Sequence, residues 1–208
     1  MKIALVFAAV FCYLHTAGHS FAQQPTLVVA QDQSGSVNSW RMRMMRLALR
    51  ETFQRVPVGF NVHWFRWAAR PEEALWSGEV TPGNRESLLE QAESAFVSGG
   101  GTYTGGAIVE SLKVIDDAWP CNSAILIITD ADRPADRDVY DSARDEVNRR
   151  GVRLGFVFVY NGDSDGLLNI HALSRDGSDW VHINSSDAER TDWDVFVSWL
   201  LEDRCQLG

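Results

Sequence analysis

The fold of this chain is decided by residues 26–36, which read TLVVAQDQSGS. The first half, residues 26–30, is apolar without alternation, which is typical of a strand covered on both faces in a parallel sheet. The second half places the side chains of Asp32, Ser34 and Ser36 in one tight loop at the end of that strand. Hard divalent cations such as Mg²⁺ and Mn²⁺ accept oxygen ligands of this kind. The loop is therefore a candidate cation site, and the alternative is a polar turn that caps the next helix.

Strand and helix patterns alternate through the rest of the chain. Period-2 alternation or short apolar runs predict further strands at residues 58–65, 74–76, 123–129, 152–160 and 180–183. Apolar residues at helical spacing predict helices at residues 37–55, 85–96, 108–119, 139–150, 167–173 and 193–200. Gly151 is expected to end one helix in a left-handed conformation. Thr191, with Asp194 three residues on, is expected to cap the last helix.

This alternation predicts an α/β fold with a doubly wound, mostly parallel six-stranded sheet and helices on both faces. Residues 74–76 are expected to form a short antiparallel edge strand, because only a brief connection separates them from the preceding strand. Ligands of such sheets bind outside the carboxyl ends of the strands. Asp32 ends the first strand, Asp130 ends the strand at 123–129, and a glycine-rich loop at 98–106 brings Thr102 to the same edge. The sequence thus predicts that three distant segments supply oxygen atoms to one place.

The formal net charge of −9 argues against a nucleic-acid partner, because phosphate binding needs a basic surface. The arginines of the predicted helix at 37–55 are its one basic cluster: Arg41, Arg43, Arg46, Arg50 and Arg55. Apolar residues recur at helical spacing between them, so we interpret these arginines as the solvent-exposed face of that helix.

The first 22 residues have the pattern of a signal peptide. Lys2 precedes an apolar run at 3–14, and small residues before Gln23 predict cleavage after Ala22. Residues 23–208 then form one secreted domain, extracellular or periplasmic, and no segment is long enough for membrane insertion. In an oxidising compartment the remaining cysteines, Cys121 and Cys205, are expected to form a disulfide; two unpaired buried thiols are the alternative.

These residues resemble the von Willebrand factor A family and its metal-ion-dependent adhesion site (MIDAS). Asp32, Ser34 and Ser36 are similar to the family's Asp-x-Ser-x-Ser loop. Thr102 matches the ligand threonine of its second loop, and Asp130 matches the aspartate that ends its fourth strand. The likeness covers most of the chain outside the signal segment. It departs from the family pattern after the last aspartate, where a glycine is common and Ala131 stands here, and before the first aspartate, where Gln31 replaces an apolar residue.

The resemblance implies an intact MIDAS. Ser34, Ser36 and Thr102 would bind Mg²⁺ or Mn²⁺ directly, with Ca²⁺ a further option, while the two aspartates would act mainly through water. An Asp or Glu carboxylate of a protein partner would fill the open coordination position. The implied function is a secreted, metal-dependent adhesion module without enzymatic activity.

Further candidate contacts lie near the predicted ion. Trp40, Tyr103 and Asp132 are candidates for partner contact, and core packing is the alternative role for Trp40. The alternative function is a metal-dependent or serine hydrolase on the same edge of the sheet. The histidines of the mature chain, His63, His171 and His182, do not lie in a recognised catalytic motif.

Two other motifs carry weaker signals. Asn161, Asp163 and Asp165 resemble the first half of a Ca²⁺ loop, but Ala172 stands where a bidentate acidic ligand belongs, so a solvated turn is the favoured interpretation. Asn184 lies in a glycosylation sequence that matters only in a host that glycosylates.

Overall fold

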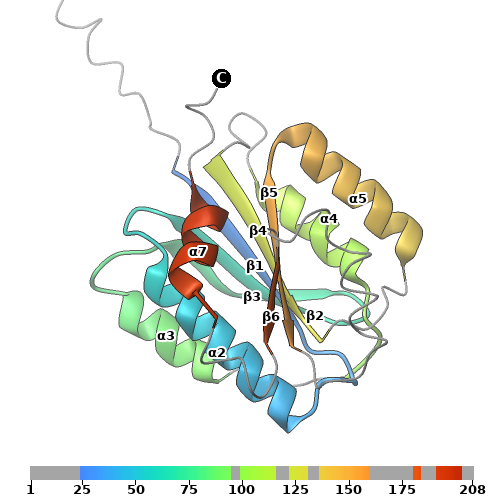
Figure 1. The fold of residues 1–208 in the computed structure, drawn as a ribbon, viewed down its shortest axis with the longest axis horizontal. Coiled ribbons are helices and arrows are strands. Elements are labelled where there is room, and N and C mark those ends of the chain that lie inside the picture. The colour runs from blue at the N-terminus through green and yellow to red at the C-terminus, as the bar shows by residue number, and fades with distance from the viewer. Residues whose placement is uncertain are drawn as a thin grey trace, which may run out of the picture.

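The computed structural model describes residues 24–94, 99–115, 122–130, 136–159, 180–183 and 191–202. A mixed sheet with the strand order β3-β2-β1-β4-β5-β6 runs through the molecule (Figure 1). The strands are β1 (Thr26–Asp32), β2 (Asn61–Trp67), β3 (Pro71–Glu79), β4 (Ser123–Thr129), β5 (Arg153–Val159) and β6 (Trp180–Ile183). Neighbouring strands are parallel except β2 and β3, which are antiparallel. The predicted α/β fold, with a mostly parallel sheet and an antiparallel edge strand, is confirmed.

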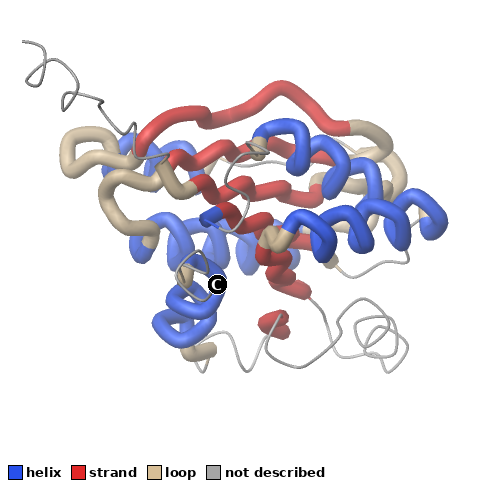
Figure 2. The backbone as a smooth tube through the Cα atoms, turned by 90° about the horizontal axis from the view of Figure 1, so that it is seen from above, coloured by secondary structure: helices blue, strands red, loops and turns tan. Residues whose placement is uncertain are grey.

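Helices cover both faces of this sheet (Figure 2). They are α2 (Ser39–Arg55), α3 (Arg85–Glu93), α4 (Thr104–Val114), α5 (Arg137–Arg150) and α7 (Trp193–Leu201). The helices α2, α3 and α7 pack in one core with Leu27 and Val29 of β1, and α4 and α5 pack in a second core with Val28 and Ala30. Because β1 supplies side chains to both cores, its apolar run lacks alternation, as predicted for a strand covered on both faces.

Several element bounds differ from the prediction. The edge strand is longer than the predicted residues 74–76 and begins at Pro71. An edge position tolerates a proline that lacks an N–H, and the exposed Glu72 and Glu73 concealed the strand pattern. β2 begins at Asn61, three residues after Val58, because Gly59 forms a turn there with φ 96°.

The ends of α5 and α7 can be compared with the predicted caps. Gly151 has φ 71° and donates its N–H to the carbonyls of Val147 and Asn148, so the predicted left-handed end of α5 is confirmed. The predicted cap of α7 at Thr191 is wrong by one residue: the Asp192 side chain accepts the N–H of Val195 at 3.0 Å. Both residues offer a side-chain oxygen to the first turn, so the sequence alone does not distinguish them.

Some predictions fall outside the residues that the structure describes. They concern the signal peptide, the helix at 167–173, the disulfide, the Ca²⁺-like loop and the glycosylation sequence: residues 1–22, Asp132, Cys121, Cys205, Asn161, Asp163, Asp165, His171 and Asn184. Within the described segments, no helix combines the length and apolar character that a membrane span requires.

Candidate metal centre

The first loop of the candidate site is fixed around Asp32, which is fully buried at the end of β1. The backbone N–H of Ser34 donates to Asp32 Oδ1 at 2.7 Å, and the hydroxyl of Thr129 donates to Asp32 Oδ2 at 2.7 Å. The hydroxyl oxygens of Ser34 and Ser36 lie 2.9 Å apart. Three oxygen-bearing side chains are therefore gathered in one loop, and the Asp32 carboxylate is anchored both by that loop and by β4.

This loop does not cap α2, which was the alternative interpretation. The cap is Asn38, whose side-chain oxygen accepts the N–H groups of Trp40 at 3.0 Å and Arg41 at 2.9 Å. Because Asn38 satisfies those first-turn donors, the oxygen atoms of Asp32 and Ser34 are not needed for capping. The polar character of the loop needs another explanation.

The glycine-rich loop lies directly against the first loop. Gly35 donates its N–H to the carbonyl of Gly100 at 3.0 Å, and Gly99 donates to the carbonyl of Gln33 at 3.1 Å. Gly99 and Gly100 have φ values of 89° and 112°, which favour glycine. Thr102 follows in this loop and is 6% exposed. The structure thus brings the predicted second segment beside the first.

Asp130 supplies the third segment and is buried. It follows β4, which pairs in parallel with β1, so both aspartates lie at the carboxyl edge of the sheet. Arg41 connects the segments: its Nη1 donates to Asp130 Oδ2 at 3.0 Å and to the carbonyl of Ser36 at 2.6 Å. Our interpretation of the helix arginines as a solvent-exposed face is therefore wrong for Arg41, because the buried carboxylate attracts its guanidinium inward.

The two aspartates influence each other electrostatically. The pKa of Asp32 is raised to about 6, first by burial and second by the negative charge of Asp130, while hydrogen bonds from Ser34 and Thr129 oppose the rise. A nearby divalent cation would reverse this effect, since it stabilises the ionised form of both carboxyl groups.

The donor set fits a hard divalent cation. It combines the hydroxyls of Ser34, Ser36 and Thr102 with the carboxylates of Asp32 and Asp130, and such oxygens suit Mg²⁺ and Mn²⁺. In the described part of the chain, no group of three or more His, Cys, Asp or Glu side chains could hold a metal ion. A metal held at this edge by the described side chains would therefore draw on the hydroxyl oxygens as well as the two carboxylates.

Asp136 is a positioning residue that the sequence analysis missed. Its carboxylate accepts the N–H of Gly105 at 3.2 Å and the N–H of Gly106 at 2.8 Å, in the first turn of α4. It therefore holds the start of the helix that follows Thr102. These contacts span about thirty residues, and no local pattern marks Asp136 as their acceptor.

The candidate partner contacts have different surroundings. Tyr103 is 41% exposed. Trp40 is partly buried and packs against the core, which favours its alternative role. The only candidate base whose side chain the structure describes is His63. It pairs with Val28, four residues before Asp32, and so lies roughly 13 Å away along the strand. This position gives the hydrolase alternative no support.

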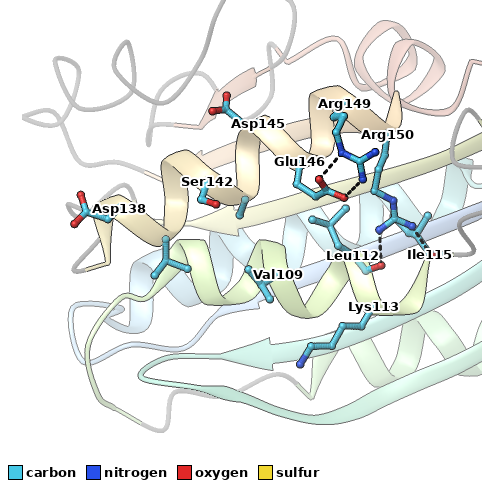
Figure 3. Close-up of a pocket in the computed structure, with 12 residues that line it drawn as sticks. Val109, Leu112, Lys113, Ile115, Asp138, Ser142, Asp145, Glu146, Arg149 and Arg150 are labelled. Carbon is cyan, nitrogen blue, oxygen red and sulfur yellow. Dashed lines mark hydrogen bonds and ion pairs between the residues drawn. The ribbon is translucent and has the colours of Figure 1, made fainter.

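A separate groove of about 890 Å³ lies between α4 and α5 and includes none of the predicted site residues (Figure 3). The arginine side chains that line it form hydrogen bonds with residues of α4 and α5. Arg149 Nε donates to Glu146 at 2.7 Å, while Arg150 donates to the carbonyls of Leu112 at 2.9 Å and Ile115 at 2.8 Å, at the end of α4. The groove is thus braced by contacts that stabilise the helix pair.

The strand order and the two helical layers define a doubly wound α/β domain whose candidate site lies at the carboxyl edge of the sheet. Comparison with solved structures identifies the fold as that of von Willebrand factor A domains. A von Willebrand factor type A protein from Catenulispora acidiphila matches with a TM-score of 0.61 and 14% identity, over 86% of this chain and 42% of that one. The chain therefore spans less than half the length of that relative.

Two further matches cover more of the compared chain. The von Willebrand factor domain of the type V pili tip protein Mfa5 from Porphyromonas gingivalis has a TM-score of 0.64 and 10% identity, over 85% and 95% of the two chains. The manganese-loaded TRAP protein of Plasmodium vivax has a TM-score of 0.58 and 16% identity, over 83% and 73%. No protein-family model matches the sequence, and no curated protein does. At these identities the likeness establishes the fold.

Proposed function

We propose that this chain is a metal-dependent protein-binding module. In this proposal Asp32, Ser34, Ser36, Thr102 and Asp130 hold one Mg²⁺ or Mn²⁺ ion, and the ion captures an Asp or Glu carboxylate of a partner. The observation that carries the proposal is the convergence of three distant segments, which gathers hydroxyls and two buried carboxylates at one edge of the sheet.

The chemistry of this donor set favours binding over catalysis. Three neutral hydroxyls and two carboxylates would leave a divalent ion without excess negative charge around it, so it would attract a further charged oxygen. Tyr103 is exposed beside Thr102 and could contact the partner around that carboxylate. The manganese in the TRAP protein and the pilus-tip origin of Mfa5 agree with a metal-dependent adhesion role.

Titration calorimetry with Mg²⁺ and Mn²⁺ tests the metal site. The wild-type chain should bind one ion, and Ser34→Ala and Thr102→Val should abolish binding without changing the thermal midpoint by more than a few degrees. Ser142→Ala, at an exposed position of α5, is the matched hydroxyl deletion and should bind as the wild type does. Undiminished binding by both site variants would refute the assignment.

The open coordination position has its own test. Water-proton relaxation of the Mn²⁺-loaded chain reports exchangeable water on the ion. Titration with acetate should lower the relaxation enhancement as a carboxylate replaces that water, whereas chloride at the same ionic strength should not. An enhancement that acetate leaves unchanged would mean that the ion accepts no carboxylate from outside.

Export to an oxidising compartment belongs to the same proposal. Cleavage after Ala22 and a disulfide between Cys121 and Cys205 would both alter the intact mass of the secreted protein. Mass spectrometry before and after reduction should show a chain beginning at Gln23 that gains about two mass units on reduction. A retained leader, or an unchanged mass on reduction, would contradict this part.

A further inference from the structure

Arg41 occupies an unusual position for a residue of the exposed helix face. Its side chain is 23% exposed, whereas the side chain of Asp130 that it contacts is 0% exposed. A single nitrogen, Nη1, makes both its contact with Asp130 and its contact with the carbonyl of Ser36. The Nε of Arg41 is buried and has no hydrogen-bond partner within the described segments. The guanidinium is thus drawn to this edge mainly by charge, without a complete set of hydrogen bonds.

This contact places a permanent positive charge inside the candidate metal centre. A guanidinium stays protonated at any pH at which the protein is folded. Asp32 and Asp130 carry the two negative charges of the donor set, and Arg41 already neutralises one of them. A divalent cation that approaches Asp130 therefore meets a like charge within hydrogen-bonding distance of the same carboxylate.

We propose that Arg41 is an internal counter-ion of the metal-free site, which competes with the divalent cation for Asp130 and so sets the metal affinity of the module. The inference rests on the proposed function, because it takes Asp130 to be part of the metal centre. It goes beyond that function by making the affinity depend on a residue outside the five oxygen donors. The incomplete hydrogen bonding of Arg41 makes its displacement feasible.

A competing Arg41 and a positioning Arg41 predict opposite changes in metal affinity when the residue is removed. If Arg41 competes with the metal, its removal takes one positive charge away from the two buried carboxylates, which destabilises the metal-free protein and tightens metal binding. If Arg41 instead holds Asp130 in a ligating position, its removal weakens both the metal-free protein and the metal complex. The affinity change therefore decides between the two roles.

The test compares Arg41→Gln with Arg43→Gln in the full chain. Both variants remove one positive charge from the first turns of α2, but Arg43 is exposed and its side chain makes no ion pair or hydrogen bond to the residues that the structure describes. Thermal midpoints are measured in EDTA at low and high salt, and dissociation constants for Mg²⁺ and Mn²⁺ are measured by calorimetry. Arg41→Lys keeps the charge on a shorter, non-forked group and is expected to fall between the wild type and Arg41→Gln.

Arg41→Gln should lower the midpoint in EDTA by about 3–6 °C and tighten Mg²⁺ binding by at least ~10-fold, as the loss of one like charge near the ion requires. Saturating Mg²⁺ should remove most of the difference in thermal midpoint between Arg41→Gln and the wild type. Arg43→Gln should change neither the midpoint in EDTA nor the Mg²⁺ affinity. Unchanged or weaker metal binding by Arg41→Gln, with normal binding by the wild type, would overturn the competition.

The outcomes separate this inference from the proposed function. If neither the wild type nor Arg41→Gln binds metal, the proposed metal centre fails and the competition fails with it. If the wild type binds and Arg41→Gln binds no more tightly, only the competition fails. Binding that is measurable in Arg41→Gln but not in the wild type would support both.

Discussion

Replacing Gly105 with alanine tests the close approach of α4 and α5 that fixes the Thr102 segment. A Cβ at this position would lie 2.4 Å from Tyr140 N, 2.8 Å from Tyr140 Cα and 2.8 Å from Val139 C. These are backbone atoms of α5, so no side-chain rotation relieves the overlap. Ordinary contacts between carbon atoms are about 3.5–4.0 Å, so the helices would have to separate by roughly 1 Å.

The neighbouring Gly106 provides a matched control. A Cβ there would lie 3.8 Å from Asp136 Oδ2 and 4.0 Å from Tyr103 Cβ, which is ordinary contact. Both substitutions relieve the entropic disadvantage of glycine in a helix by about 0.5–1 kcal/mol. Gly106→Ala should therefore be neutral or slightly stabilising. Overpacking should destabilise Gly105→Ala by about 1–3 kcal/mol or more, so the two variants should differ by ~3 kcal/mol.

Urea unfolding followed by circular dichroism measures this difference directly, and thermal melting provides a second estimate. A gap of ~3 kcal/mol corresponds to about 6–12 °C in the thermal midpoint of a domain of this size. Equal unfolding midpoints for Gly105→Ala and Gly106→Ala would show that α5 does not approach α4 here. The placement of the Thr102 segment would then be wrong as well.

Three further predictions concern the support of the site. Asp136→Ala should lower the unfolding free energy by about 1 kcal/mol, because Gly105 and Gly106 lose the acceptor for their N–H groups; an unchanged urea midpoint would contradict that capping role. Thr129→Val should lower the unfolding free energy by about 1.5–3 kcal/mol at pH 7, because the ionised Asp32 carboxylate loses a hydroxyl donor. The loss should be smaller at pH 5, where Asp32 is protonated. An equal loss at both pH values would show that the strength of the hydrogen bond does not depend on the charge of Asp32. The pKa of Asp32 is about 6 in the folded protein, against an ordinary value of 3.8, so between these pH values the metal-free native state binds more protons than the unfolded state. This group should therefore lower the unfolding free energy by ~3 kcal/mol as pH rises from 4 to above 6. Urea unfolding in EDTA should reveal that loss and saturating Mg²⁺ should remove it, whereas a group without a raised pKa would give no such metal-sensitive loss.

The order of strands and helices was predictable because burial leaves a direct mark on sequence. β1 and β4 are covered on both faces, so their residues read as continuous apolar runs. The carboxyl ends of neighbouring parallel strands lie at one edge of the sheet, so the sequence alone predicts that Asp32 and Asp130 lie at the same edge. The edge strand β3 leaves no such mark, because all of its residues are exposed or only partly buried and its pairing with β2 contains register shifts.

The start of α4 was misjudged for a related reason. Glycines in residues 98–106 predicted a loop through Gly106, but the helix begins at Thr104. A glycine stands at position 105 of the helix because α5 leaves no room for a side chain there. The first turn is stabilised by Asp136, whose carboxylate accepts the N–H of Gly105. Both causes are tertiary contacts. Helix propensity disfavours glycine, so it predicts a later start for α4 than the structure has.

Arg41 shows the limit of local patterns most clearly. Its spacing places it on the polar side of α2, together with four other arginines, and that pattern predicts a solvated face. Its partner Asp130 lies 89 residues away along the chain. Only the parallel pairing of β1 with β4 brings the two residues together, so the residue pattern of α2 alone assigns Arg41 to the solvated face.

The energetics of Asp32 favour a functional reason for the site. A buried carboxyl group whose pKa is raised to about 6 destabilises the folded protein at neutral pH, so stability does not explain its presence. Capping does not explain it either, since Asn38 caps α2. Hydrogen bonds from Ser34 and Thr129 keep the carboxylate fixed despite this cost. A group that is held rigidly where it lowers stability is typical of a binding site, because the ligand supplies the compensating interaction.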